Sequence, residues 1–193
     1  MVVRTRKKSI LEPNWGEWRL QRFAAVPAGV ADWLRDEGSL TRRVVQACGE
    51  GQFRVRLLHQ AWGSPLYSES KVLRLRRGEA TLIREVELLC DGHPWVFART
   101  LIPATSLKGS ARRLTQLGEK PLGAVLFSDS RIQRGITQIA RLHPRHPLFA
   151  SAAANLQQQP QTLWGRRTLF YISNRPILVN EIFLPELPQS GQA

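Results

Sequence analysis

Residues 81–102 read TLIREVELLCDGHPWVFARTLI, two apolar runs on either side of Asp91-Gly92. Both runs are rich in the aliphatic and aromatic residues that strands favour. An Asp-Gly pair accepts the left-handed backbone of a tight turn, so we predict a hairpin with strands over Thr81 to Cys90 and Trp95 to Ile102. This hairpin indicates an antiparallel sheet.

The segments on either side of the hairpin add strands and helices to it. Alternating apolar residues predict further strands at residues 53–58, 72–76, 167–173 and 177–184. Apolar residues at helical spacing predict helices at residues 28–37, 40–47, 106–117 and 130–142, with Ser39 as the N-cap of the second. Residues 143–161 are rich in Pro, Gln and Ala, which predicts a long surface loop or a loose helix. This order indicates an α+β fold and not the strand-helix alternation of a Rossmann domain.

Length and composition indicate one soluble domain. A chain of 193 residues, 42% hydrophobic, can bury a core without disulfides or a structural metal. We expect the domain over residues 15–187, between a flexible basic N-terminus (1–14) and a flexible tail (188–193). The distant Cys48 and Cys90 are expected to be separate buried thiols in a reducing compartment. Neither a targeting signal nor an apolar run of membrane-spanning length is present, so we expect a cytoplasmic protein.

The charge is strongly positive but scattered. Twenty-eight Lys and Arg against fifteen Asp and Glu give +13 and a pI of about 11.2. The basic residues form no single tail, and the chain has no zinc finger, RNP aromatic pair or Gly-x-x-Gly clamp. We therefore expect a monomer that attracts a small anion, with no nucleic-acid partner and no stable membrane insertion.

Two charged residues share the strand face of apolar neighbours. Arg84 has the parity of Leu82, Val86 and Leu88, while Glu181 has the parity of Val179 and its apolar neighbours. Buried charges are unfavourable unless they are paired, so one interpretation is a structural Arg84–Glu181 ion pair. The other is a ligand site, in which Arg84, with help from Arg99, receives a carboxylate and Glu181 contacts a polar atom at the ligand's far end.

Other candidate sites are weaker. His143 and His146 lie among prolines without nearby carboxylates or thiols, and Cys90 with His93 lacks two further ligands, so we expect no metal site. The sequence contains no Ser-His-Asp order, nucleophile elbow or glycine-rich phosphate loop. Arg166 and Arg167 should face opposite sides of a strand, one structural and the other solvated.

Six groups of residues, in order along most of the chain, resemble the bacterial chorismate lyase family, also called 4-hydroxybenzoate synthase. They are Trp33-Leu34 with GSLTR at 38–42, LIRE at 82–85 with LLCDG at 88–92 and Pro94-Trp95, ART at 98–100, LGEKPLG at 117–123 with Leu126-Phe127, WGRR at 164–167 and NEIFLP at 180–185. The resemblance implies a six-stranded antiparallel sheet flanked by helices, with the ligand in an internal cavity. A departure from the family is the length of residues 143–161.

The resemblance also implies an activity and its residues. The family's ligand-contacting positions fall on Arg84, Glu181, Leu40 and Leu122. The leucine at position 122 would contact the ligand through its backbone, and the family can have Met at position 40. We expect a lyase that removes pyruvate from chorismate to give 4-hydroxybenzoate, the first step of the ubiquinone branch, without cofactor or metal. Arg84 and Glu181 would be the catalytic pair. The alternative from the same fold is a non-catalytic small-molecule-binding module such as a regulator's effector domain, although the 14 residues before Trp15 are too few for a DNA-binding domain.

Overall fold

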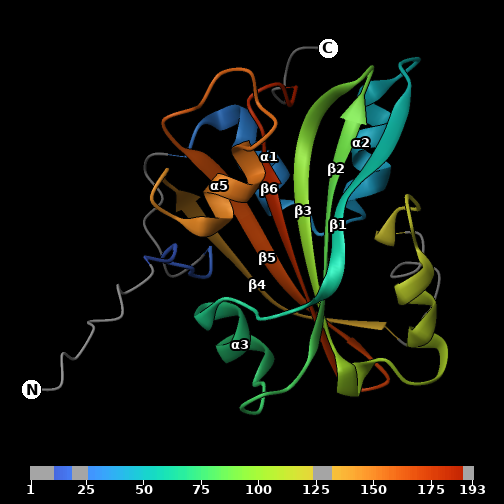
Figure 1. Ribbon diagram of the computed structural model, residues 1–193. Coiled ribbons are helices and arrows are strands. Elements are labelled where there is room, and N and C mark those ends of the chain that lie inside the picture. The colour runs from blue at the N-terminus through green and yellow to red at the C-terminus, as the bar shows by residue number, and fades with distance from the viewer. Residues whose placement is uncertain (1–10, 19–25, 124–131, 189–193) are drawn as a thin grey trace, which may run out of the picture.

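The computed structural model describes residues 11–18, 26–123 and 132–188 (Figure 1). Within them, six antiparallel strands form one sheet in the order β1-β2-β3-β6-β5-β4. The strands are β1 Phe53–Gly63, β2 Thr81–Cys90, β3 His93–Pro103, β4 Ile132–Leu142, β5 Leu163–Ile172 and β6 Arg175–Phe183. The predicted α+β class, with a single six-stranded antiparallel sheet flanked by helices, is confirmed.

Two hairpins build the middle of the sheet. Asp91 and Gly92 have φ angles of 51° and 83° between β2 and β3, as the Asp-Gly pair predicts. Ser173 and Asn174 have φ angles of 49° and 62° between β5 and β6, so this turn begins one residue earlier than expected. Because β3 pairs with β6, the two hairpins lie side by side.

Helices cover both faces of the sheet. In Figure 1, α3 (Tyr67–Leu73) and α5 (Pro147–Ala153) lie in front of the sheet, and α1 (Ala28–Arg35) and α2 (Leu40–Cys48) lie behind it. We call these the front and back faces. The 3-10 helix η2 (Gly109–Gln116) packs through Ala111 and Leu114 on back-face residues, and a shorter 3-10 turn, η1 (Ala104–Ser106), precedes it. The two predicted helices at residues 28–37 and 40–47 are therefore present, and the Ser39 hydroxyl accepts a hydrogen bond from the Arg42 N–H at 3.4 Å.

The described part of the helix predicted at residues 130–142 is strand β4, so that prediction is wrong. A β-bulge between Arg134 and Thr137 shifts the pairing of β4 with β5. Ile132 and Ile139, an odd number of residues apart, consequently both pack into back-face core clusters. The bulge offsets the two-residue period of the strand, and the resulting spacing resembles that of a helix.

Three other segments also differ from the predictions. The strand expected at residues 72–76 is wrong, because α3 occupies its start and Arg74 ends the helix with a φ of 52°. Glu69 begins this helix by accepting a hydrogen bond from the Leu66 N–H at 2.8 Å, a capping signal that the short alternating pattern obscures. The helix predicted at 106–117 is present only as the 3-10 helix η2. Residues 143–161 do contain a helix, one of the two forms predicted, but this helix, α5, is buried through Leu148 and Phe149.

The two cysteines are not separate thiols. A disulfide joins Cys48, at the end of α2, to Cys90, at the end of β2, with 5.7 Å between the two Cα atoms. Packing of α2 across the sheet brings together residues that are far apart in the sequence, which spacing alone does not reveal. Gly51 leaves room for the bridge, since a Cβ there would lie 2.9 Å from each sulfur.

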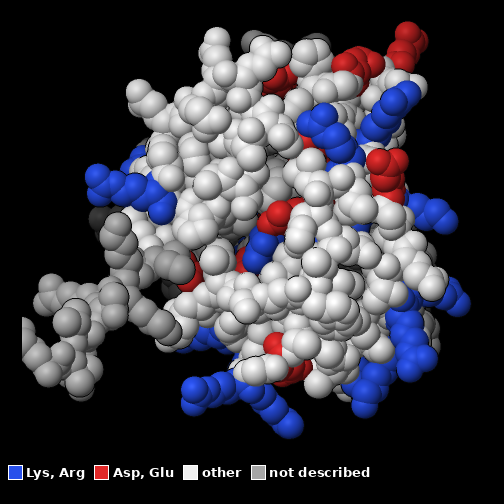
Figure 2. All heavy atoms as spheres, viewed as in Figure 1, with Lys and Arg blue, Asp and Glu red and all other residues white. Residues whose placement is uncertain are grey.

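The basic residues of the front face are spread around its margin, with a small recessed group of acidic and basic side chains near the centre (Figure 2). This distribution agrees with the scattered charge of the sequence. No helix in the described part of the chain is both long and apolar enough to cross a bilayer.

Candidate functional site

A pocket lies on the back face of the sheet, between the strands and the segments that cover them. The empty space in and around it, counted together with open solvent at its mouth, is about 570 Å³. All four sequence-predicted site residues line it: Leu40, Arg84, Leu122 and Glu181. Its wall is otherwise mainly apolar, and is made by Val55, Val86, Leu88, Ala98, Phe170 and Val179 together with the polar and charged residues described below. The structure therefore brings together four residues that are dispersed over more than two thirds of the chain.

Arg84 is a buried cation held by neutral groups. Its side chain is 1% exposed, and Nη2 donates to the carbonyl oxygens of Gly118 and Lys120 at 2.8 and 3.0 Å. Nε is buried and has no hydrogen-bond partner among the described residues. Burial lowers the pKa of Arg84, because no carboxylate among the described residues compensates for the loss of hydration. The site thus keeps a desolvated guanidinium with an unused donor.

The partner of Glu181 is Arg166, and the Arg84–Glu181 ion pair weighed in the sequence analysis is absent. Arg166 Nε donates to Glu181 Oε2, and the two residues are directly opposite each other on β5 and β6. Arg166 also donates to the carbonyls of Trp33, at 3.0 Å, and Asp36. It is 1% exposed and lines the pocket. Arg166 therefore fixes the Glu181 carboxylate and ties the end of α1 to the sheet.

The leucines close the pocket from two covering segments. Leu40 is the first residue of α2, and Leu122 follows the loop whose carbonyls accept from Arg84. The two segments pack closely at Gly123, where a Cβ would lie 3.0 Å from Thr41 Oγ1 and 3.2 Å from Ser39 Oγ. A Cβ at position 123 would therefore require these hydroxyl groups to move by a few tenths of an ångström.

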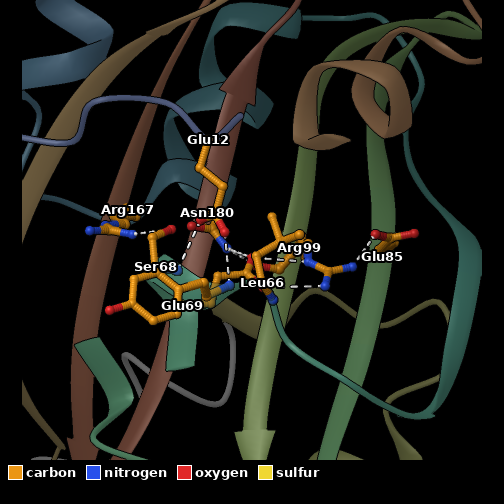
Figure 3. A network of polar contacts seen from close by, with 9 residues as sticks. Glu12, Leu66, Ser68, Glu69, Glu85, Arg99, Arg167 and Asn180 are labelled. Atoms are coloured by element: carbon orange, nitrogen blue, oxygen red, sulfur yellow. Dashed lines mark hydrogen bonds and ion pairs between the residues drawn. The ribbon is translucent and has the colours of Figure 1, made fainter. Parts of the chain in front are cut away.

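Arg99 does not belong to this pocket, so its expected help to Arg84 is wrong. It lies on the front face and donates to Glu69 Oε1 at 3.0 Å and to Glu85 Oε1 at 2.6 Å (Figure 3). Although burial alone would lower the pKa of Arg99, these two carboxylates raise it. Asn180 joins the same network through a 3.0 Å hydrogen bond to Glu69. Thr100 pairs with Arg84 across β2 and β3, so their side chains lie on the same face. Because neighbouring side chains along a strand point to opposite faces, the side chain of Arg99 lies on the other side of the sheet.

Arg167 is buried and not solvated. It was expected to be solvated if Arg166 was structural, but it is 5% exposed on the front face. It donates to Ser68 Oγ at 3.2 Å (Figure 3). It also donates to Gln138 Oε1 at 2.8 Å, and its guanidinium lies 4.8 Å from the centre of the Trp15 ring. Burial lowers the pKa of Arg167 to about 10. Helix α3 and residues 11–18 cover this side chain, which explains its low exposure.

The candidate metal residues have other partners. Cys90 is in the disulfide, and His93 Nδ1 lies 2.6 Å from a Glu186 oxygen. The His143 N–H donates to His146 Nδ1 at 3.0 Å. In the ranges that the structure describes, no three His, Cys, Asp or Glu side chains are grouped as a metal site requires.

Two pocket residues, Arg134 and Arg166, were missed as site residues. Arg166 stood within a quoted motif, but its pairing with Glu181 depends on the register of β5 against β6, which no local pattern specifies. Arg134 lies at the bulge of β4, in the segment predicted as a helix. One feature of the sequence does point to them: residues 130–180 contain no carboxylate. Glu181 is therefore the first acidic partner that this part of the chain offers to its arginines.

The chain is similar to known proteins over most of its length. A family model described as "Chorismate lyase" matches residues 14–190. A protein named "Probable chorismate pyruvate-lyase" from Nitrosomonas europaea is 40% identical, over 84% of this chain and 90% of that protein. One of the same name from Methylococcus capsulatus is 43% identical, over 82% and 98%.

Solved structures show the same fold. The effector domain of PhnF from Mycobacterium smegmatis has a TM-score of 0.56 and 19% identity, over 77% of this chain and 90% of that one. The ligand-binding domain of a putative GntR-family transcriptional regulator from Bordetella bronchiseptica has a TM-score of 0.51 and 19% identity, over 72% and 87%. These likenesses concern the fold alone.

Proposed function

The chain belongs to the chorismate lyase family, and from this premise we propose that it removes pyruvate from chorismate to give 4-hydroxybenzoate, the first step of the ubiquinone branch. The observation that carries the proposal is the pocket on the back face. It combines apolar walls with three arginines and one glutamate, Arg84, Arg134, Arg166 and Glu181. Their formal charges sum to +2, which matches a substrate that carries two carboxylates.

In this proposal, Arg84 and Glu181 hold opposite ends of the substrate ring. They lie two strands and two residues apart on one face, which corresponds to about 12 Å between their Cα atoms in a regular sheet. Arg84 binds the ring carboxylate and uses the Nε donor that has no partner among the described residues. Glu181 accepts a hydrogen bond from the ring hydroxyl; the hydrogen bonds found among the described residues use only Oε2, so Oε1 is available.

The reaction follows from the substrate's own chemistry once it is held in this way. The bond from the ring to the ether oxygen breaks, the hydrogen beside the hydroxyl leaves its carbon, and the methylene of the departing enolpyruvyl group gains a proton. The ring becomes aromatic, and 4-hydroxybenzoate and pyruvate contain all the atoms of chorismate. The protein therefore contributes mainly orientation and charge complementarity, and no electron acceptor or group donor is needed for the balance.

The electrostatics of the pocket support substrate capture. A desolvated guanidinium stabilises an anion more strongly than a hydrated one, because little water screens the interaction. The net charge of +13 would also attract a dianion from solution, an effect that salt weakens. Leu40, Leu122 and the apolar walls exclude water from the ring. Because the covering segments must separate before the product leaves, product release is expected to be slow.

The test is to incubate purified, metal-free protein with chorismate and to measure 4-hydroxybenzoate and pyruvate by chromatography. Stoichiometric amounts of enzyme and substrate are included, so that a single turnover is detected even if the product stays bound. Equimolar appearance of both products is the expected result. No product, with chorismate or 4-hydroxybenzoate still binding, would contradict the proposal and favour a binding module of the same fold.

A further inference from the structure

Arg134 is a pocket cation that the roles above leave unused. It lies on β4 at the bulge, and its Nη1 donates to the carbonyl of Glu37. Its Nε is buried and has no hydrogen-bond partner among the described residues. Its guanidinium carbon lies 5.7 Å from the centre of the Phe170 ring, which also lines the pocket. The pocket thus has a second buried donor, in addition to Arg84 Nε.

The guanidinium of Arg134 is close to that of Arg166. The two side chains donate to consecutive carbonyls, Glu37 for Arg134 and Asp36 for Arg166, in the loop between α1 and α2. The pKa of Arg134 is lowered first by burial and then by the charge of Arg166, although Glu181, Glu37 and Asp36 raise it in part. A negative group placed between the two arginines would relieve their repulsion.

Arg134 also separates the pocket from the protein surface. Besides lining the pocket, it lines a surface hollow together with Trp18, Arg35, Glu37 and Thr137. Arg84 and Glu181 line the pocket but not this hollow. Arg134 is therefore the pocket cation nearest to the solvent on this side.

We propose that Arg134 binds the carboxylate of the departing three-carbon group and so distinguishes substrate from product. This inference rests on the proposed function. Arg84 takes the ring carboxylate, and Arg166 is engaged by Glu181 and by two backbone carbonyls. Apart from Arg84, Arg134 is the arginine of the pocket lining whose buried Nε has no hydrogen-bond partner among the described residues, and this donor can take the second carboxylate.

This role has two consequences. The substrate has a carboxylate on the three-carbon group that 4-hydroxybenzoate lacks, so Arg134 should contribute to substrate binding and little to the binding of that product. After the ether bond breaks, pyruvate is the fragment that remains on Arg134, beside the surface hollow. It is therefore expected to leave on that side, before the aromatic product.

The test compares Arg134→Met with Arg141→Met, an exposed arginine on the same strand whose loss changes the net charge equally. For Arg134→Met we expect kcat/KM for chorismate to fall by at least about tenfold, since a charge partner of the substrate is lost. The dissociation constant of 4-hydroxybenzoate, measured by calorimetry, should change less than about twofold, because the variant removes no contact to that product. Arg141→Met should match the wild type in both, and Arg134→Lys should recover part of kcat/KM.

The inference would be overturned if Arg134→Met lowered kcat/KM for chorismate and the affinity for 4-hydroxybenzoate by the same factor, or if it left kcat/KM unchanged. In either case, lyase turnover by the wild type would still support the proposed function. Absence of turnover in the wild type would overturn both. If Arg134→Met does not fold, Arg134→Gln and Arg134→Lys provide the same comparison, with melting temperature as the check on folding.

Discussion

Replacing Arg84 or Arg166 by Met should separate binding from stability, although both arginines are 1% exposed in the same pocket. Arg84→Met removes two hydrogen bonds to carbonyls but also removes a desolvated charge that has no carboxylate partner in the part of the chain that the structure describes. These effects oppose each other, so the free energy of unfolding should change by less than about 2 kcal/mol. Arg166→Met leaves Glu181 without its cation and two carbonyls without their donor, which should cost about 3–5 kcal/mol.

These free energies convert into thermal shifts of different size. For a domain of this size, 1 kcal/mol corresponds to roughly 2–4 °C in Tm, so Arg84→Met should move Tm by less than about 8 °C and Arg166→Met should lower it by roughly 6–20 °C. Arg84→Met also removes the cation that binds the ring carboxylate of the substrate. This loss should cost about 2–5 kcal/mol in the transition state, or about 30- to 5,000-fold in kcat/KM. Melting is followed by circular dichroism and turnover by the formation of pyruvate. An Arg84→Met protein that melts as early as Arg166→Met, yet keeps kcat/KM within a few fold of wild type, would refute the assignment.

Three further predictions concern Glu181, the disulfide and His146. Glu181→Gln keeps an acceptor for Arg166, so its Tm should fall less than that of Arg166→Met, while turnover is largely lost. A near-normal kcat would show that the carboxylate takes no part in the reaction. Reducing the Cys48–Cys90 bridge, which closes a separation of 42 residues, should lower stability by up to about 4 kcal/mol in the chain-entropy account, measured as Tm with and without reductant, and an unchanged Tm would contradict this. Burial, and secondarily the charge of His143, lower the pKa of His146, so its stabilising contribution is complete above the unfolded-state value of about 6.5 and is lost as pH falls through the lower folded value. The drop in Tm between pH 7.5 and 5.5 should therefore be smaller in His146→Asn than in the wild type, and equal drops would count against it.

The central hairpin and the orientation of Arg84 could be predicted because each depends on local chemistry. Asp91-Gly92 specifies a tight turn, and strand parity places Arg84 with Val86 and Leu88 on the face where the pocket lies. The same parity placed Glu181 correctly. The family resemblance added Leu40 and Leu122, which the residues alone did not single out and which line the same pocket.

The remaining features depend on pairings between distant segments. The bulge in β4 imitates helical spacing, so Ile132 and Ile139 misled the helix prediction. The partner of Glu181 follows from the register of β5 against β6, and parity alone could not choose Arg166 over Arg84. The disulfide likewise depends on how α2 packs against the end of β2.

We propose that Arg84 and Glu181 hold the two ends of the ring on which the reaction occurs. Its most direct test is a crystal structure of the protein grown with 4-hydroxybenzoate. We expect the product inside the back-face pocket, with its carboxylate on Arg84 Nε and its phenolic oxygen on Glu181. A product bound outside this pocket, or bound within it with neither group contacting these side chains, would show that Arg84 and Glu181 do not hold the ring.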